Sequence, residues 1–124
     1  MRFTKFTMSI EPEEFFVSQC SNAGETYDFL SVQGLQLEIN LIPFVFFVHS
    51  YAGAWRVSDM VTGHRITIED SKTRYHAILE AVSRFEKDND PVVTILDGWA
   101  KILPLAGLSP KCKEKADDSP RHDR

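Results

Sequence analysis

Cysteine is scarce in this chain of 124 residues, and the usual patterns of metal and phosphate sites are missing. The two cysteines, Cys20 and Cys112, lie far apart in unlike surroundings, so we expect reduced thiols rather than a disulfide scaffold. The four histidines lack the spacing of zinc ligands, and the six glycines stand singly rather than in a phosphate-binding loop. The sequence therefore predicts neither a metal site nor another cofactor.

Long hydrophobic runs are also missing. No run approaches the roughly 18 apolar residues that a membrane-spanning helix needs, and the N-terminus lacks the apolar segment of a secretory signal. We therefore expect a cytoplasmic protein that does not enter a membrane.

Basic residues are outnumbered by acidic ones. The chain has 14 Lys and Arg against 18 Asp and Glu, which gives a net charge of −4. Without residues 109–124, nine basic and fourteen acidic residues remain. An acidic domain does not attract phosphate backbones through its net field, so nucleic acid is not the expected partner.

The residues that are present predict one small α+β domain. The length suits a single domain with its own core, and nine Phe make that core rich in aromatic rings. We expect residues 1–108 to form an antiparallel sheet of four to five strands covered by helices. Residues 109–124 contain almost no apolar side chain, which predicts a disordered polar tail.

The N-terminal segment is expected to contain a strand and then a helix. Residues 2–8 mix Phe and Thr with polar positions, which suits a short strand or a loosely docked lead-in. Pro12 followed by two glutamates is typical of the first turn of a helix, and apolar residues follow at helical spacing. We therefore predict a short helix over residues 12–21.

The middle of the chain predicts strands. Apolar and polar residues alternate as in a strand with one face on a core, the apolar ones being Leu35, Leu37, Ile39 and Leu41. Residues 44–48 are apolar at consecutive positions, so this strand is either central and covered on both faces or exposed on one face for a partner. Two further strands are expected at residues 54–59 and 64–68, after turns at residues 50–53 and 62–63.

A helix is predicted over residues 71–87. Ser71 or Thr73 can cap its N-terminus, and Glu80 can pair with Arg84 one turn later. Its apolar stripe is formed by Tyr75, Ile78, Val82 and Phe85. This stripe should cover one face of the sheet.

A second helix is favoured after residue 90. Asp90 is a natural cap, Pro91 suits the first helical position, and apolar residues recur at helical intervals beyond it. The competing interpretation is a strand at residues 92–96, because four of these five residues are β-branched.

Polar side chains offer few catalytic candidates. His49 and Asp59 stand at the ends of strands that could be neighbours, and they form the one acid–base pair suited to a small hydrolase. Such a pair more often consists of two ordinary polar residues at the protein surface. Glu69 and Asp70 adjoin, but consecutive strand residues point to opposite faces, and before a helix they mainly complement its dipole.

A short basic segment offers a different kind of site. Lys72, Arg74 and His76 lie at a predicted helix start, where they could hold a phosphate or form a solvated helix end. The order of helix, three strands and helix resembles a double-stranded RNA-binding domain. That family has a strongly basic helix start, which is reduced here to Lys72 and Arg74.

Residues 55–85 resemble a second family in the order of their elements. The segment WRVSDMVTG, a second strand and the helix SKTRYHAILEAVSRF are similar to the strand, turn, strand and helix of HicB-like antitoxins. They are also similar to many short proteins encoded by phages and mobile elements. HicB-like proteins inhibit a partner ribonuclease toxin, so the resemblance implies inhibition of a bacterial protein. The sequence lacks the DNA-binding segment that family members commonly add, which puts autoregulation in doubt.

These observations together predict a non-enzymatic protein-binding module. We expect an inhibitor of a bacterial defence or toxin protein, encoded by a phage or mobile element. Aromatic and Arg residues contribute most to interfaces, and the expected contact residues are Phe44, Phe46, Tyr51, Trp55 and Arg56. A homodimer formed by a self-pairing strand edge would use the same residues. Nucleic-acid binding and a small hydrolase stay open as alternatives.

Overall fold

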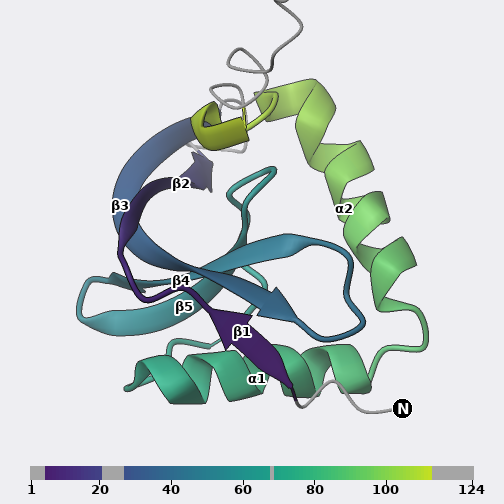
Figure 1. Ribbon diagram of the computed structural model, residues 1–124. Helices are drawn as coiled ribbons and strands as arrows, with labels where there is room; N and C mark the ends of the chain where they lie inside the picture. The colour runs from purple at the N-terminus through teal and green to yellow at the C-terminus, as the bar shows by residue number, and fades with distance from the viewer. Residues whose placement is uncertain (1–4, 21–26, 68, 113–124) are drawn as a thin grey trace, which may run out of the picture.

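The computed structural model describes residues 5–20, 27–67 and 69–112. These residues form a curled antiparallel sheet with one helix packed across it and a second helix running beside it (Figure 1). The α+β class and the antiparallel sheet that the sequence predicted are confirmed.

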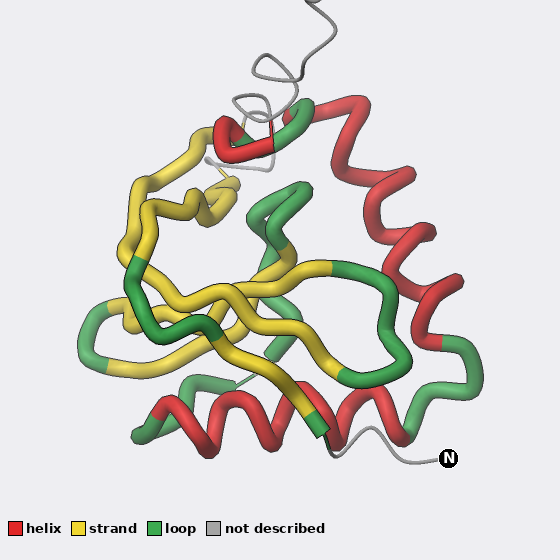
Figure 2. Tube along the Cα trace, in the orientation of Figure 1, coloured by secondary structure: helices red, strands yellow, loops and turns green. Residues whose placement is uncertain are grey.

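Five strands make up the sheet: β1 (Phe6–Met8), β2 (Glu13–Cys20), β3 (Tyr27–Ile39), β4 (Val45–Tyr51) and β5 (Ala54–Asp59). The hydrogen-bonded order is β1-β3-β4-β5, and β2 also pairs with β3. β1 and β2 follow one another along the same edge of β3, while β4 occupies its other edge. The sheet therefore curls around the long strand β3, as the tube in Figure 2 shows.

β2 lies where the sequence predicted a helix, so that prediction was wrong. All eight residues of β2 pair with β3, from Glu13 opposite Gly34 to Cys20 opposite Tyr27. Phe15 and Val17 alternate inward and are buried, as in a strand with period two. The aromatic and β-branched residues of β2 suit a strand. Hydrogen bonding along the edge of the 13-residue strand β3 therefore outweighs the helix-like pattern that begins at Pro12.

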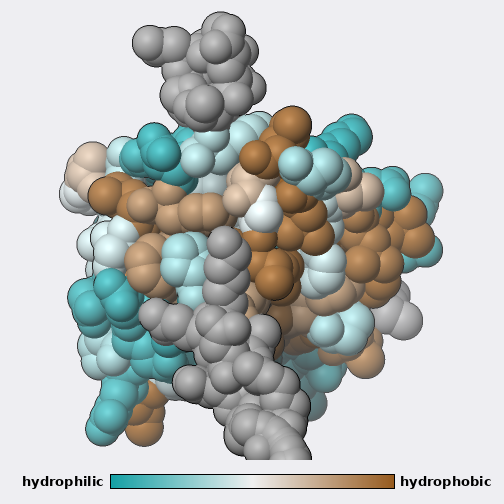
Figure 3. All heavy atoms as spheres, turned by 90° about the horizontal axis from the view of Figure 1, so that it is seen from above, coloured by the Kyte–Doolittle hydropathy of each residue, from teal (hydrophilic) through white to brown (hydrophobic). Residues whose placement is uncertain are grey.

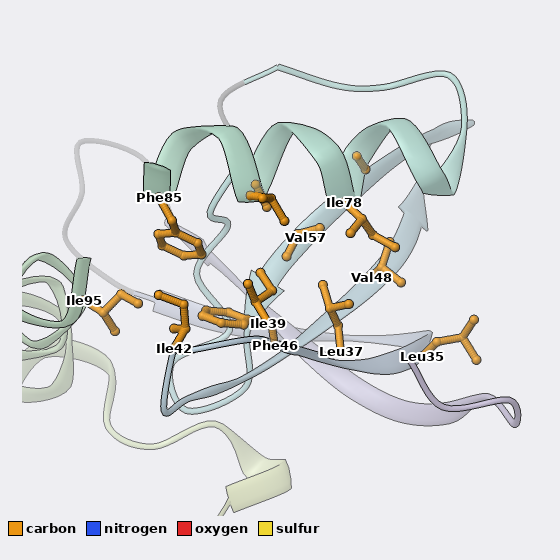
Figure 4. Packing of buried hydrophobic residues seen from close by; sticks show 13 residues of the cluster. Leu35, Leu37, Ile39, Ile42, Phe46, Val48, Val57, Ile78, Phe85 and Ile95 are labelled. Carbon is orange, nitrogen blue, oxygen red and sulfur yellow. The ribbon is translucent and has the colours of Figure 1, made fainter. Parts of the chain in front are cut away.

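The main core fills the face of the sheet toward helix α1 (Arg74–Glu86). Figure 4 shows its side chains pointing between the helix and β3, β4 and β5. The buried members are Leu35, Leu37, Ile39, Ile42, Phe46, Val48, Val57, Ala77, Ile78, Ala81, Val82, Phe85 and Ile95. Hydrophobic burial on this face holds α1 against the sheet.

The capping and packing of α1 follow the sequence pattern with two exceptions. Thr73 is the N-cap and its side chain accepts a hydrogen bond from the backbone N–H of His76 at 3.1 Å. Tyr75, which we placed in the buried stripe, is 61% exposed at the first turn. The expected pair also does not form, because Arg84 donates to the carbonyl of Ile66 instead.

Helix α2 (Pro91–Ala106) confirms the helical interpretation and excludes the strand at residues 92–96. Asp90 caps it by accepting from the N–H of Val93 at 3.2 Å. The helix ends at Ala106, and the capping Gly107 that follows has a φ of 77°, a conformation that favours glycine.

β4 is central and covered on both faces, which is the first of the two alternatives for residues 44–48. Phe46 and Val48 face α1, whereas Phe47 faces the opposite, concave side of the curled sheet. There the rings of Phe47 and Phe15 stack with centroids 4.5 Å apart. Phe15, Val17 and Phe47 form a second cluster, which we call the concave core.

The turns differ in how well the sequence located them. Ala52 and Gly53 join β4 to β5 with φ of 52° and 84°, as expected for a two-residue hairpin loop. Leu41, which we placed at the end of the alternating strand, is instead in a turn with φ of 71° and is 56% exposed.

Residues 64–67 do not continue the sheet as the strand we predicted, and Ile68 lies outside the described residues. Arg65 forms an isolated bridge with Ser58, and Ser71 forms another with Trp55. The turn after β5 is held against β2, so the returning chain meets β5 at single points rather than along a ladder.

The folded part continues past residue 108. The backbone N–H of Ser109, a fully buried residue, donates to Val61 at 2.8 Å. Lys111 lies 2.9 Å from Glu13 and its ammonium group stands 4.8 Å from the centre of the Phe15 ring. The segment through residue 112 therefore closes one end of the concave core, and the remainder of the predicted tail, residues 113–124, lies outside the described residues.

Candidate functional site

A cavity of about 200 Å³ opens on the concave side of the sheet. We call it the polar cavity. Its walls come from β2, β4, β5 and the loop that follows β5. The lining residues are Val17, Ser18, Gln19, His49, Tyr51, Arg56, Ser58, Gly63, His64 and Arg65.

The loop after β5 forms one wall of the polar cavity, and Asp59 shapes it. The buried Asp59 carboxylate accepts from the N–H of Thr62 at 3.1 Å and from its hydroxyl at 2.5 Å. Gly63 follows with φ of 73°, and its carbonyl accepts from the N–H of Ser18 at 2.9 Å. A Cβ at this position would lie 2.5 Å from a backbone oxygen of β2, so glycine is required for the loop to lie this close.

His49 is almost completely buried beside this cavity, with 1% of its surface exposed. Its Nε2 lies 3.0 Å from the hydroxyl of Ser58. Burial lowers the pKa of His49 from 6.5 to about 4, the backbone of Ser50 opposes the shift, and the positive charges of Arg56 and Arg65 add to it. His49 is therefore neutral near pH 7, in a positive electrostatic potential.

Two buried polar atoms among the described residues have no hydrogen-bond partner: Oγ of Ser18 and Nδ1 of His49. Both belong to residues that line the polar cavity. Such an atom costs about 1–3 kcal/mol of stability, and native proteins contain few of them. Their occurrence around one cavity marks the most polar part of the concave side as a candidate binding site.

Two partly exposed guanidinium groups belong to the same wall. Nε of Arg56 lies 2.6 Å from Oδ1 of Asp70, and its Cζ stands 4.5 Å from the centre of the Tyr51 ring. Nη2 of Arg65 lies 3.2 Å from the same Oδ1. Hydrogen bonding to Arg56 holds the pKa of the Asp70 carboxyl below its usual value.

The charges that line the polar cavity are of one sign. Its described lining includes Arg56, Arg65 and two histidines, but no Asp or Glu, although acidic residues outnumber basic ones in the chain. An anionic group would therefore be more favourable here than a cationic one.

A second cavity of about 220 Å³ lies between α1, α2 and residues 64–66. Phe85, Ile95 and Trp99 line it, and Nε1 of Trp99 donates to Oδ2 of Asp59 at 2.9 Å. This hydrogen bond ties α2 to the end of β5. The carboxylate of Asp59 therefore accepts hydrogen bonds from Thr62 and Trp99, which hold the fold together.

The predicted acid–base pair of a small hydrolase does not form. His49 is opposite Arg56 in the β4–β5 ladder, whereas Asp59 is opposite Phe46. Successive strand residues point to opposite faces, so His49 lies on the concave side and Asp59 on the side of α1. The sequence placed both residues at strand ends but did not reveal this difference of face.

The five expected contact residues are divided between core and surface. Phe46 is fully buried in the main core, so its side chain is not exposed to a partner in this structure. The ring of Phe44 packs edge-on against that of Trp99, with the ring centroids 4.9 Å apart. Trp55 is partly buried and packs against the main core. Tyr51 and Arg56 are partly exposed beside the polar cavity, which only the folded structure reveals.

β4 also cannot pair with a second copy through its edges. Both edges are already occupied, by β3 and by β5. Self-pairing through β4 is therefore not open to this structure, because a central strand has no free backbone groups to offer, and a homodimer stays a prediction.

The basic residues near the start of α1 do not converge on a site within the described residues. Lys72 and Arg74 are exposed on either side of the capping Thr73. The guanidinium carbon of Arg74 stands 5.9 Å from the centre of the Trp55 ring. Nearby, the backbone N–H of Glu69 donates to the Glu80 carboxylate at 3.4 Å. Phosphate binding here stays a prediction.

The outer face of α2 was missed by sequence reasoning. Only Pro91 and Ile95 of this helix are buried, whereas Val93, Leu96 and Leu105 are 48%, 45% and 65% exposed. In Figure 3 hydrophobic side chains gather on the side of the molecule where α2 lies. The signal was the near absence of charge from a 16-residue helix, in which Asp97 and Lys101 alone are charged.

Comparison with known proteins gives no family. No protein-family model, curated protein sequence or solved structure has a significant match to this chain. No helix among the described residues is both long and apolar enough to cross a membrane. Across residues 5–20, 27–67 and 69–112, no three His, Cys, Asp or Glu side chains gather as metal ligands would.

Proposed function

We propose that this chain is a non-enzymatic protein-binding module that uses the outer face of α2. Val93, Leu96, Ala100 and Pro104 recur at intervals of three, four and four residues and are all exposed. Residues at this spacing share one face of a helix. We call this set the α2 stripe.

The exposure of the α2 stripe is the observation that carries the proposal. A helix that is apolar nearly all round is usually buried, because water solvates it poorly. α2 buries only Pro91 and Ile95 against its own domain. A partner that covers the stripe would remove the rest of this apolar surface from water.

A second copy of the chain is the partner that the stripe itself favours. In an antiparallel pair centred near Trp99, the stripe of one copy packs against the stripe of the other. Asp97 of each copy then faces Lys101 of the other, because the two positions are equally far from the centre. Apolar contact and two opposite-charge pairs would coincide in one symmetric interface.

It stays a hypothesis that this chain is encoded by a phage or mobile element and inhibits a bacterial defence or toxin protein. It rests on the resemblance of residues 55–85 to HicB-like antitoxins. The α2 stripe is separate from those residues, so the two ideas can be tested separately.

The test introduces one charge at two matched positions. Leu96→Glu places it on the α2 stripe, and Leu79→Glu places it on α1, at a residue that is 40% exposed against 45% for Leu96. Sedimentation equilibrium over a range of concentrations should show a dimer for the wild type and for Leu79→Glu. Leu96→Glu should be monomeric, because burying an unpaired charge in an interface is costly.

Charge reversal then checks the arrangement of the two copies. Asp97→Lys and Lys101→Asp should each weaken the dimer, and the double variant should restore it, since the opposite charges face one another again. A monomeric wild type would exclude the second copy as partner. Capture from a bacterial lysate then compares the two Leu→Glu variants. If Leu96→Glu and Leu79→Glu retain the same proteins, the α2 stripe is not the contact surface.

A further inference from the structure

The polar cavity is not used by binding through α2. It lies on the concave side of the sheet, opposite the face that packs against α1. Its volume of about 200 Å³ admits a small organic molecule, since one water molecule occupies about 30 Å³ in the liquid. It is therefore a separate candidate site.

The wall of the cavity is built for negative charge. Arg56 and Arg65 both lower the pKa of buried His49, so their positive potential extends to the buried end of the wall. No carboxylate belongs to the described lining. Guanidinium groups match the planar oxygens of carboxylates and the oxygens of phosphates better than other side chains do.

The wall also retains unused hydrogen-bonding capacity. Oγ of Ser18 and Nδ1 of His49 are buried and have no hydrogen-bond partner among the described residues. Only 1% of the His49 surface is exposed. Beside them, Nε2 of Gln19 donates to the hydroxyl of Tyr51 at 3.1 Å. Polar atoms gathered around a cavity in this way are expected where a ligand completes their hydrogen bonds.

We propose that the polar cavity binds a small organic anion, either a carboxylate or a phosphate ester. The anionic oxygens would face Arg56 and Arg65, and the organic part would lie against Val17 and the ring of Tyr51. Asp70, which lies outside the cavity lining, contacts both guanidinium groups. Asp70 thus holds the two arginines in place and competes with the bound anion.

The experiment titrates the protein with benzoate, phenyl phosphate and the neutral analogue benzamide. The readout is the NMR signal of the His49 ring, assigned by its loss in His49→Gln. Benzoate or phenyl phosphate should shift this signal in a saturable way, and the tighter of the two identifies the anion class. Benzamide should bind at least about tenfold more weakly, because it lacks the charge that the arginines recognise.

Three variants place the site. Arg56→Gln should weaken binding of the anion at least about tenfold, whereas Arg74→Gln, which removes the same charge from α1, should change it less than about twofold. Asp70→Asn should tighten binding, since it removes the competing carboxylate. Leu96→Glu should leave the affinity unchanged, which separates this site from the α2 stripe.

Several outcomes would overturn the proposal. They are the absence of saturable binding by both anions to folded wild-type protein, equal binding of benzamide, and unchanged affinity in Arg56→Gln. Thermal melting of each variant shows whether it is folded. If Arg56→Gln does not fold, a loss of affinity in Asp70→Asn instead of a gain would contradict the placement of the anion.

Discussion

The two faces of the sheet are built on different principles. Thirteen buried apolar residues fill the face toward α1, and every buried residue of that helix belongs to this cluster. Among the described residues, the buried apolar cluster of the concave face has only three members, Phe15, Val17 and Phe47, and it adjoins a cavity lined with charged and polar residues. Both unpartnered buried polar atoms of the described residues belong to residues that line this cavity.

The contrast separates what folds the chain from what it can do. A face that served stability alone would have no reason to keep buried polar atoms without partners, because each one costs free energy. β4 supplies both faces from adjacent residues, with Phe46 in the main core and Phe47 in the concave core. One strand therefore connects the stable side to the candidate site.

Truncating these two rings gives the largest expected effects. Phe46→Ala should lower the free energy of unfolding by about 4 kcal/mol, because removal of a fully buried ring leaves a cavity that the other residues of the main core cannot fill. Phe47→Ala should cost less, about 3 kcal/mol, since its smaller cluster adjoins a cavity that can admit water. Urea denaturation monitored by circular dichroism measures both values.

The order of these two values decides the comparison. A greater loss in Phe47→Ala than in Phe46→Ala would mean that the concave core contributes more to stability than its three residues suggest. The distinction drawn between the faces would then be wrong.

A second prediction concerns the loop that closes the concave side. Gly63→Ala should destabilise the protein by about 3 kcal/mol, because its Cβ would meet β2 and its φ is positive. Gly53→Ala is the matched control: its φ of 84° is equally unfavourable, but a Cβ there meets nothing within 4 Å. It should cost only about 1 kcal/mol. Equal losses in the two variants would show that the close approach of the loop to β2 contributes nothing.

The sequence predicted the main core better than the concave side. Leu35, Leu37 and Ile39 alternate cleanly, and the buried spacing of α1 is close to 3.6 residues, so local periodicity sufficed. β2 could not be predicted in this way. Its residues carry a helix-like start, and only the long neighbouring strand β3 makes the extended conformation favourable.

The candidate sites were harder to predict because they depend on which face each residue occupies. His49 was singled out, but its apparent partner Asp59 points to the other side of the sheet. Its actual neighbours Ser58 and Arg65 come from the strand and loop that follow, at positions that the curl of the sheet determines. The α2 stripe could have been found from the sequence, since the helix carries too little charge to be solvated all round.

The smallest of the three effects is a pH dependence that only the concave side should show. Burial lowers the pKa of His49 from its ordinary value of 6.5 to about 4 in the folded state. The unfolded chain therefore takes up a proton as the pH falls below about 6.5, while the folded chain does not until about pH 4. Stability from this residue is complete above pH 6.5 and is lost progressively between those two values.

From about pH 8 to about pH 5 this loss should amount to about 2 kcal/mol, measured as the difference in unfolding free energy between wild type and His49→Gln. His64→Gln changes an exposed histidine and should retain the wild-type dependence. If His49→Gln shows the same decline as the wild type, His49 is not the group responsible. A bound anion should reduce the decline, because negative charge beside the ring favours its protonated form and raises the folded-state pKa. The same titration with saturating benzoate or phenyl phosphate therefore links the stability of the concave side to occupation of its cavity.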